Sequence, residues 1–465
     1  MANMWTQMYK YGTFTSKAVS LAPSFPVFLK WYTFLQKSQW WSREQLEEYQ
    51  LEKLHALVRH AYEHVPYYTR VFDERGVKPK DIQDFKDLQL LPFLTKDIIR
   101  DHFQELKARN LPESRFEHVN TGGTVKIIAV YYEKGVSRAR EWAFIKTIWD
   151  RVGYHFADKC AILRGYRVAP SIDGVLAKQG LFGRWLILSP FDLTKENIPR
   201  YIALMRRFKP RYIQAYPSLV LIIAQYMMYH KLAPIKGLRG ILAGSEGLNL
   251  TQKRFLEEVF HCPVLRWYGH AEQAVLGGEC ELSDTYHVFR EYGILELVDQ
   301  QGHLIDSPGK TGEIVATGLH NRTMPLLRYK TQDLSQYAPG GCSCGREYPL
   351  LADVEGRLHD FVVCKNQRVA SLNALINAVR GLERFPPVLE IQYIQETPGE
   401  ILINLVKGPG YKQGDDAKIV DAVDGIFGDQ LKAQIHYVNA IPRKKNGKYL
   451  RLIQKLSVGF EDYHD

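Results

Sequence analysis

The stretch GILAGSEGLNLTQKRFLEEVFHCPVLRWYGHAE, residues 240–272, decides the fold. Residues 240–244 and 264–269 are short apolar runs bounded by glycines and a proline, a pattern typical of buried strands. Between them, residues 251–260 read as a helix. Strand, helix and strand in this order predict a βαβ unit, and therefore an α/β fold with helices on the faces of a sheet.

The same alternation continues on both sides of this stretch. Upstream, residues 211–216 read as a strand and residues 219–229 as a helix. Downstream, residues 293–299 and 313–317 are short strands joined by turns rich in glycine and proline. After residue 357 the pattern changes, and the strands and helices are then expected at the following places: strands at 388–394, 401–406 and 434–438, and helices at 371–384 and 415–427.

The first hundred residues are mainly helical in pattern. Ser42 is a good N-cap, and Gln45 stands three residues later, where a capping box has Glu or Gln. Apolar residues at helical spacing follow over 46–65, and Pro66 ends that helix.

With 465 residues the chain is long enough for two domains. We expect an α/β domain over 1–357, of which 1–115 is the mainly helical lead-in. A smaller, mobile α+β domain is expected over 358–465.

Charge and composition favour a soluble, cytoplasmic protein. The net charge of +10 comes from Lys and Arg that are spread along the whole chain, so we expect a solvated basic surface and no nucleic-acid partner. Residues 1–22 lack the apolar core of a secretory signal, and no apolar run reaches the ~20 residues of a transmembrane helix. Six cysteines in a chain of this length do not indicate a disulfide scaffold.

Six short motifs carry residue types suited to nucleotide chemistry. The glycines and hydroxyls of 120–124 (NTGGT) can wrap a phosphate, and 244–247 (GSEG) follows a strand, where ligands gather in α/β sheets. In 267–272 (WYGHAE) a tyrosine can stack on a base and a carboxylate can hold Mg²⁺. An aspartate such as that in 328–334 (RYKTQDL) can accept hydrogen bonds from ribose hydroxyls. The last two are 356–360 (GRLHD) and 447–448 (GK).

The order and spacing of these motifs resemble the adenylate-forming superfamily of acyl-CoA synthetases, peptide-synthetase adenylation domains and luciferases. More narrowly, the chain is similar to the phenylacetate-CoA ligase and coenzyme F390 synthetase group, and within it to the capsular-polysaccharide-biosynthesis branch. The narrower resemblance rests on 39–42 (QWWS), 60–68 (HAYEHVPYY), 216–218 (YPS) and 342–346 (CSCGR). It covers nearly the whole chain and implies the adenylate-forming fold.

The resemblance also implies roles for individual residues. Lys448 and Glu272 correspond to the catalytic lysine and to the glutamate associated with magnesium, and His359 occupies the interdomain hinge. The residues implied to bind ATP or AMP are Thr121, Gly122, Gly123, Thr124, Gly244, Ser245, Glu246, Tyr268, Gly269, Asp333 and Arg357, and those implied to border the acyl pocket are Tyr216, Pro217 and Ser218.

Two positions depart from the family pattern. The phosphate loop continues as Val125-Lys126 where the family has a further glycine, so the loop is about one residue short. The hinge carries His359 where Asp or Lys is usual; histidine titrates near neutrality, which makes a pH-sensitive hinge an alternative to a plain tolerated substitution.

Three cysteines and one histidine form a second group of candidate functional residues, suited to binding a metal. Cys342 and Cys344 form a Cys-x-Cys in a glycine-rich turn, and Cys280 and His287 lie upstream. Three thiolates and one imidazole are a ligand set of closed zinc sites, and some members of the resembling group carry zinc at corresponding positions. Two interpretations of these residues therefore remain open: a structural zinc site, or buried free thiols.

The function expected from the resemblance is a ligase. ATP and Mg²⁺ would activate a carboxylic acid as an acyl-adenylate, and the acyl group would pass to a thiol such as CoA or to an amine, in a capsule-related pathway. The alternative is a catalytically degenerate member of the fold that binds a nucleotide or an assembly partner. The sequence predicts neither the acid, nor the acceptor, nor the oligomeric state.

Overall fold

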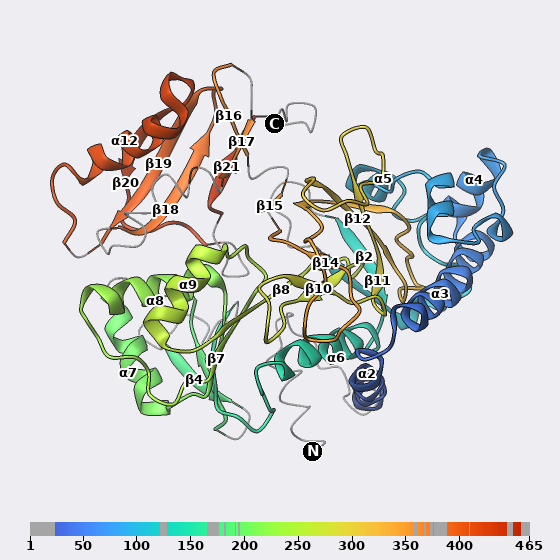
Figure 1. The fold of residues 1–465 in the computed structure, drawn as a ribbon, viewed down its shortest axis with the longest axis horizontal. Coiled ribbons are helices and arrows are strands. Elements are labelled where there is room, and N and C mark those ends of the chain that lie inside the picture. The colour runs from blue at the N-terminus through green and yellow to red at the C-terminus, as the bar shows by residue number, and fades with distance from the viewer. Residues whose placement is uncertain are drawn as a thin grey trace. The chain divides into compact units, whose positions relative to one another are not determined.

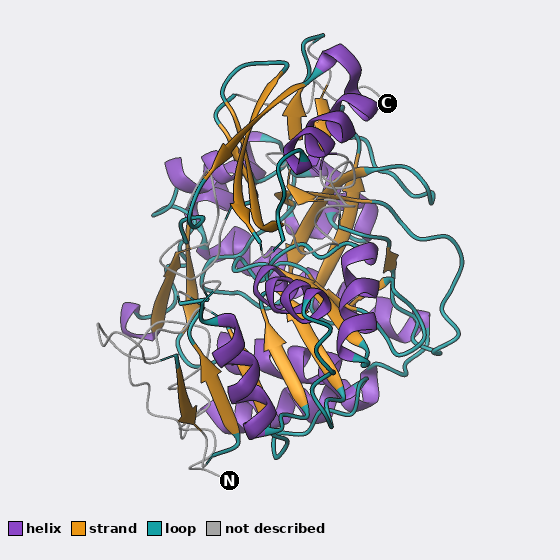
Figure 2. Cartoon of the chain, turned by 90° about the vertical axis from the view of Figure 1, so that its left-hand side faces the viewer, coloured by secondary structure: helices purple, strands orange, loops and turns teal. Residues whose placement is uncertain are grey.

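A computed structural model gives the fold as a mixture of helices and strands (Figure 2). It describes residues 24–120, 128–164, 176–180, 183–190, 192–193, 196–354, 356–357, 361–366, 369–372, 375, 388–408, 410–443 and 450–456. The predicted α/β class is confirmed. Among these residues, no helix has both the length and the apolarity needed to cross a bilayer.

The chain forms two compact units, each built from separate stretches. The first joins the described residues before His155 to Arg266–Val354, and the second joins His155–Leu265 to the described residues after Val354. The domain boundary expected at 357/358 separates a C-terminal part that moves as a body. The division into two compact units does not test such movement, so this boundary stays a prediction.

Helices open the first unit, at the right of Figure 1. They are α2 (Ser24–Ser38), α3 (Arg43–His64), α4 (Pro66–Glu74) and α5 (Lys96–Asp101), with 3₁₀ turns at Pro79–Asp81, Phe85–Leu90 and Glu113–Arg115. The predicted capping box is confirmed, because the Ser42 side chain accepts from the Gln45 amide and the Gln45 side chain accepts from the Ser42 amide. Pro66 is the first residue of α4, where its missing N–H costs nothing.

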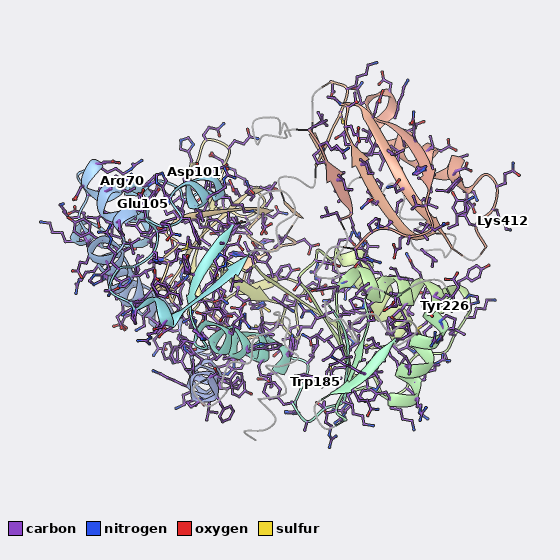
Figure 3. All side chains as sticks on the ribbon, turned by 180° about the vertical axis from the view of Figure 1, so that it is seen from behind. Arg70, Asp101, Glu105, Trp185, Tyr226 and Lys412 are labelled. Carbon is purple, nitrogen blue, oxygen red and sulfur yellow. The ribbon has the colours of Figure 1, made fainter. Side chains whose placement is uncertain are left out.

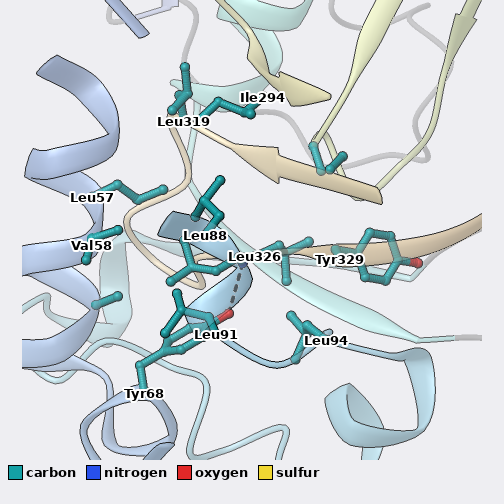
Figure 4. Packing of buried hydrophobic residues seen from close by; sticks show 14 of the residues in the cluster. Leu57, Val58, Tyr68, Leu88, Leu91, Leu94, Ile294, Leu319, Leu326 and Tyr329 are labelled. Atoms are coloured by element: carbon teal, nitrogen blue, oxygen red, sulfur yellow. Dashed lines mark hydrogen bonds between the residues drawn. The ribbon is translucent and has the colours of Figure 1, made fainter. Parts of the chain in front are cut away.

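A buried apolar cluster ties these helices to the strands of the same unit (Figure 4). Leu57 and Val58 of α3 belong to this cluster together with Leu88, in the 3₁₀ turn at Phe85–Leu90, and Leu91, directly after that turn. Tyr68 is anchored among them, since its hydroxyl donates to the Pro325 carbonyl and accepts from the Leu327 amide, both at 3.0 Å. The cluster therefore fixes the start of the strand that carries the predicted ribose-binding aspartate.

Three groups of strands complete the first unit. The pair β1 (Phe116–Asn120) and β2 (Ala129–Glu133) is antiparallel and precedes α6 (Ser137–Asp150). A second antiparallel sheet has the order β11 (Gly293–Val298), β12 (Gly312–Gly318) and β13 (Tyr329–Ser335). The third group is β8 (Val264–Gly269, which enters this unit at Arg266), β9 (Leu276–Gly278), β10 (Tyr286–Val288) and β14 (Leu350–Leu351), each antiparallel to the next.

The first unit contains ion pairs both at its surface and in its interior. At the surface, Arg70 and Glu105 meet at 2.7 Å (Figure 3). Inside, the Arg328 guanidinium is held by both carboxylate oxygens of Glu296, at 2.9–3.2 Å. Removing one partner of such a buried pair would leave an uncompensated charge, so Arg328 and Glu296 depend on each other.

A parallel sheet forms the core of the second unit. Its strands stand in the order β7 (Gly240–Gly244), β6 (Tyr212–Ala215), β3 (Cys160–Leu163), β5 (Trp185–Leu188) and β4 (Ala177–Gly180). All neighbours are parallel except β4 and β5. The helices α7 (Ile198–Phe208), α8 (Pro217–Tyr229) and α9 (Leu250–Phe260) bury their apolar sides in the same cluster as these strands. The strands and helices predicted over 211–269 are thus confirmed.

The rest of the second unit is a small sheet covered by a helix. Its strands have the order β20 (Lys432–Tyr437), β19 (Glu400–Lys407), β18 (Val388–Gln395) and β21 (Leu452–Gln454), and α12 (Asp415–Phe427) lies over them (Figure 1). Short strands β15 (Gly356–Arg357), β16 (Phe361–Val363) and β17 (Val369–Ser371) precede it, and a 3₁₀ turn at Gly428–Gln430 follows α12. The α+β pattern is confirmed, whereas most of the helix expected over 371–384 lies outside the described residues.

Candidate active site and metal centre

Tyr268 and Asp333 come together in the first unit. Tyr268 is near the end of β8 and Asp333 is in β13, and the tyrosine hydroxyl donates to Asp333 Oδ2 at 2.7 Å. Burial and the nearby Asp333 charge raise the pKa of Tyr268 well above its usual value, so the hydroxyl remains a donor. The bond joins a residue implied to bind adenine to the one implied to bind ribose.

Glu272 lies in the same neighbourhood, and its charge contributes to the raised pKa of Tyr268. The Tyr329 hydroxyl donates to Glu272 Oε1 at 2.7 Å, and His270 Nδ1 lies 3.2 Å from Oε2. Burial raises the pKa of Glu272, but His270, Lys96 and the Tyr329 hydroxyl stabilise the carboxylate and bring the pKa to about 2. Glu272 is therefore a buried, ionised carboxylate, a type of group that attracts a hard cation such as Mg²⁺.

Sequence reasoning missed Lys96 as a member of this site. Its ammonium donates to Gln332 Oε1 at 2.9 Å, and its charge lowers the pKa of Glu272. Gln332 has a φ of 67°, a conformation that residues other than glycine rarely adopt and that is often kept at functional sites. The sequence around Lys96 gives no indication of this role, because its hydrogen-bond partner Gln332 is more than two hundred residues away along the chain.

Gly269 is packed closely against the paired strand. A Cβ built on it would come within 2.6 Å of Leu276 Cδ1 on the paired strand. That atom is the end of a flexible side chain that can move aside, so the packing of β8 against β9 does not by itself require a glycine at this position.

The described residues of the predicted acyl pocket, and those of the predicted adenine segment at 244–246, belong to the second unit. Gly244 ends β7, and Ser245 and Glu246 follow it. Tyr216 follows β6, and Pro217 and Ser218 begin α8. The Ser218 amide donates to Glu246 Oε2 at 3.0 Å, so the structure joins the predicted acyl-pocket segment to the predicted adenine segment.

Several predicted residues lie outside what can be described. These are Thr121, Gly122, Gly123, Thr124, His359 and Lys448. For Arg357 the described part is its backbone, in β15.

Cys280, His287, Cys342 and Cys344 form one cluster in the first unit. Their ligand atoms all lie within 4.8 Å of one another, with Cys280 Sγ 3.5 Å from Cys342 Sγ and Cys344 Sγ 3.2 Å from His287 Nε2. A zinc ion with Zn–S bonds of about 2.3 Å would hold two sulfurs about 3.8 Å apart, so the cluster fits a tetrahedral zinc site. His287 Nδ1 faces the Thr285 carbonyl at 3.2 Å, an outer hydrogen bond that would aim Nε2 at the metal.

Comparison with known proteins supports the resemblance over most of the chain. A family model described as the CapK C-terminal domain matches residues 362–455. Phenylacetate-coenzyme A ligase of Thermus thermophilus is 28% identical over 335 residues, covering 70% of this chain and 74% of that protein. Protein CapK of Staphylococcus aureus is 23% identical over 423 residues, covering 87% of this chain and 88% of that protein.

A solved structure agrees with the fold. That of 2-hydroxyisobutyryl-CoA ligase in the postadenylation state matches with a TM-score of 0.69, covering 90% of this chain and 93% of that one at 19% identity. The chain has the adenylate-forming fold. In this fold, as the resemblance implied, a large N-terminal domain is followed by a smaller C-terminal one.

Proposed function

We propose that the protein is an acid ligase that uses ATP to adenylate a carboxylic acid and then transfers the acyl group. The observation that carries this is the joint placement of Tyr268, Asp333 and Glu272 in a chain with the adenylate-forming fold. The phenylacetate-coenzyme A ligases among its relatives support it. Its test is release of pyrophosphate from ATP that depends on an added acid.

Two bond exchanges make up the reaction. In the first, the acid carboxylate attacks the α-phosphorus of ATP, an acyl–phosphate bond forms and pyrophosphate leaves. In the second, a thiol such as CoA or an amine attacks the acyl carbon, and AMP leaves while the nucleophile loses its proton. Both steps need accurate positioning and stabilisation of negative charge.

Residues of this chain would share that work. Asp333, held by Tyr268, would accept hydrogen bonds from the ribose, and Glu272 would bind Mg²⁺, which neutralises phosphate charge when bound. By resemblance, Thr121 to Thr124 would bind the phosphates, Gly244, Ser245, Glu246 and Gly269 would line the adenine site, and Arg357 would assist. Lys448 would reach the α-phosphate and the attacking carboxylate, with His359 at the hinge of the mobile part, 358–465.

The metal cluster would have a structural role in this enzyme. Cys280, His287, Cys342 and Cys344 would hold zinc and fasten the loop after β13 to the hairpin β9–β10. Because β9 also pairs with β8, the ion would help to fix Tyr268.

A biosynthetic role in capsule or exopolysaccharide formation is supported by the similarity to CapK and to its C-terminal domain. An amine as the final acceptor is the alternative to CoA. The second candidate function, a catalytically degenerate nucleotide-binding or assembly protein, is favoured by the shortened loop at Val125-Lys126.

Replacing Asp333 with asparagine should weaken ATP binding about 10- to 100-fold, because a charged hydrogen bond to the ribose is worth ~1.5–3 kcal/mol. Calorimetric titration with ATP measures this. Asp429→Asn, at an exposed residue bonded to the adjacent Gln430, is the control and should bind ATP as the parent does. Equal ATP affinity of Asp333→Asn and the parent would contradict the ribose role.

A further inference from the structure

Three parallel strands of the second unit end at the same edge and are followed by polar residues. Arg164 follows β3, Tyr216 follows β6 and Ser245 follows β7. The Arg164 side chain donates to Ser245 Oγ at 2.5 Å, and its guanidinium lies 5.2 Å from the centre of the Tyr216 ring. Arg164 is only 4% exposed, so a buried cation lies where the acyl-pocket and adenine segments meet.

Glu246 and Ser218 add further polar atoms at this place. Glu246 Oε2 accepts from the Ser218 amide in the first turn of α8, a favourable position for a negative charge. Glu246 Oε1 and Ser218 Oγ are both shielded from solvent, and neither has a hydrogen-bond partner within the described part of the chain. Ser218 as a whole is 5% exposed. Buried polar atoms without partners are costly, and they point to a ligand that supplies the missing bonds.

We propose that Arg164, Ser218 and Glu246 form a subsite for the hydroxyl groups of the acid, so that the substrate is a hydroxylated carboxylic acid. This inference rests on the proposed function and names the substrate class of that site. A guanidinium only donates hydrogen bonds, an ionised carboxylate only accepts them, and a hydroxyl does both. The hydroxyls of a ligand would therefore satisfy all three side chains together.

Other classes of acid fit these groups less well. An aryl or alkyl acid would leave Ser218 Oγ and Glu246 Oε1 without partners. A second carboxylate on the ligand would approach Arg164 favourably but would be repelled by Glu246. Sites built to hydrogen-bond a substrate hydroxyl reject analogues that lack it by large factors.

The test compares matched acids on the full-length protein. Glucuronate is paired with cyclohexanecarboxylate, and gluconate with hexanoate, by pyrophosphate release with ATP and by calorimetric binding in the presence of AMP. At least one hydroxylated acid should exceed its partner about 100-fold or more in kcat/KM. Ser218→Ala and Arg164→Lys should each reduce that ratio about tenfold or more. The exposed Ser114→Ala should keep the ratio.

Each outcome decides the inference. Preference for the hydroxylated acid, reduced in Ser218→Ala, supports it, and a preference that Ser218→Ala and Arg164→Lys leave unchanged overturns it. Equal or better use of the alkyl acids overturns it while leaving acid activation intact. If no acid is turned over, the proposed function fails, and binding still decides the subsite: tighter binding of a hydroxylated acid supports it, and no such binding overturns it.

Discussion

Replacing Glu272 with glutamine should lower acid-dependent pyrophosphate release about 100- to 1,000-fold, with the largest loss at low Mg²⁺. Glutamine has nearly the same shape and can still accept from the Tyr329 hydroxyl, so the substitution removes mainly the charge. That charge is present throughout the working range, because the pKa of Glu272 is about 2. Rates measured across a Mg²⁺ titration separate lost metal binding from lost folding.

Glu291→Gln is the matched control for this change. Glu291, like Glu272, is a buried carboxylate of the first unit, and it accepts hydrogen bonds from Ser38 and Tyr348. Burial raises its pKa, so an uncharged side chain is tolerated more easily there. The control should keep its activity and Mg²⁺ dependence. A Glu272→Gln enzyme with parental rates at every Mg²⁺ concentration would contradict the proposed role of Glu272.

Replacing His287 with alanine should abolish zinc binding and lower the melting temperature by at least about 5 °C, because metal-binding energy at a structural site is folding energy. The parent should contain about one zinc ion per chain. Elemental analysis and thermal melts with and without a chelator measure both effects. Since burial lowers the pKa of His287 to about 4, its imidazole is neutral and able to bind a metal at ordinary pH.

Cys364→Ala is the control for the zinc measurement. Cys364 lies in the second unit, and burial raises the pKa of its thiol. This variant should retain its zinc. A parent protein that holds no zinc after purification from zinc-supplemented medium, and that melts at the same temperature with chelator, would favour the interpretation as buried free thiols.

The parts of the fold that could be predicted from the sequence are those that depend on local interactions. The capping box of Ser42 and Gln45 and the strand–helix–strand of 240–272 depend on neighbours in the sequence, and both are confirmed. The pairing of residues 266–354 with the N-terminal helices depends on contacts between distant segments. No periodicity in the sequence contains that information.

The candidate site likewise contains residues that the sequence predicts and residues that only the fold brings to it. Asp333 and Glu272 could be predicted because each lies in one of the six motifs, and the order of those motifs resembles the adenylate-forming superfamily. Their partners Tyr329 and Lys96 were not assigned roles, since hydroxyl and ammonium groups become meaningful only when the fold brings them to a carboxylate. Arg164 had one usable signal, its position directly after a buried strand, where ligands of α/β folds gather.

The most direct measurement of the central claim is pyrophosphate release from MgATP across a panel of aryl, fatty, amino and hydroxylated acids, each with and without CoA and amines. The account predicts that at least one acid gives release well above the rate without acid, and that Glu272→Gln abolishes most of it. No release with any acid, together with no binding of ATP, would contradict the account and favour the degenerate, non-catalytic alternative.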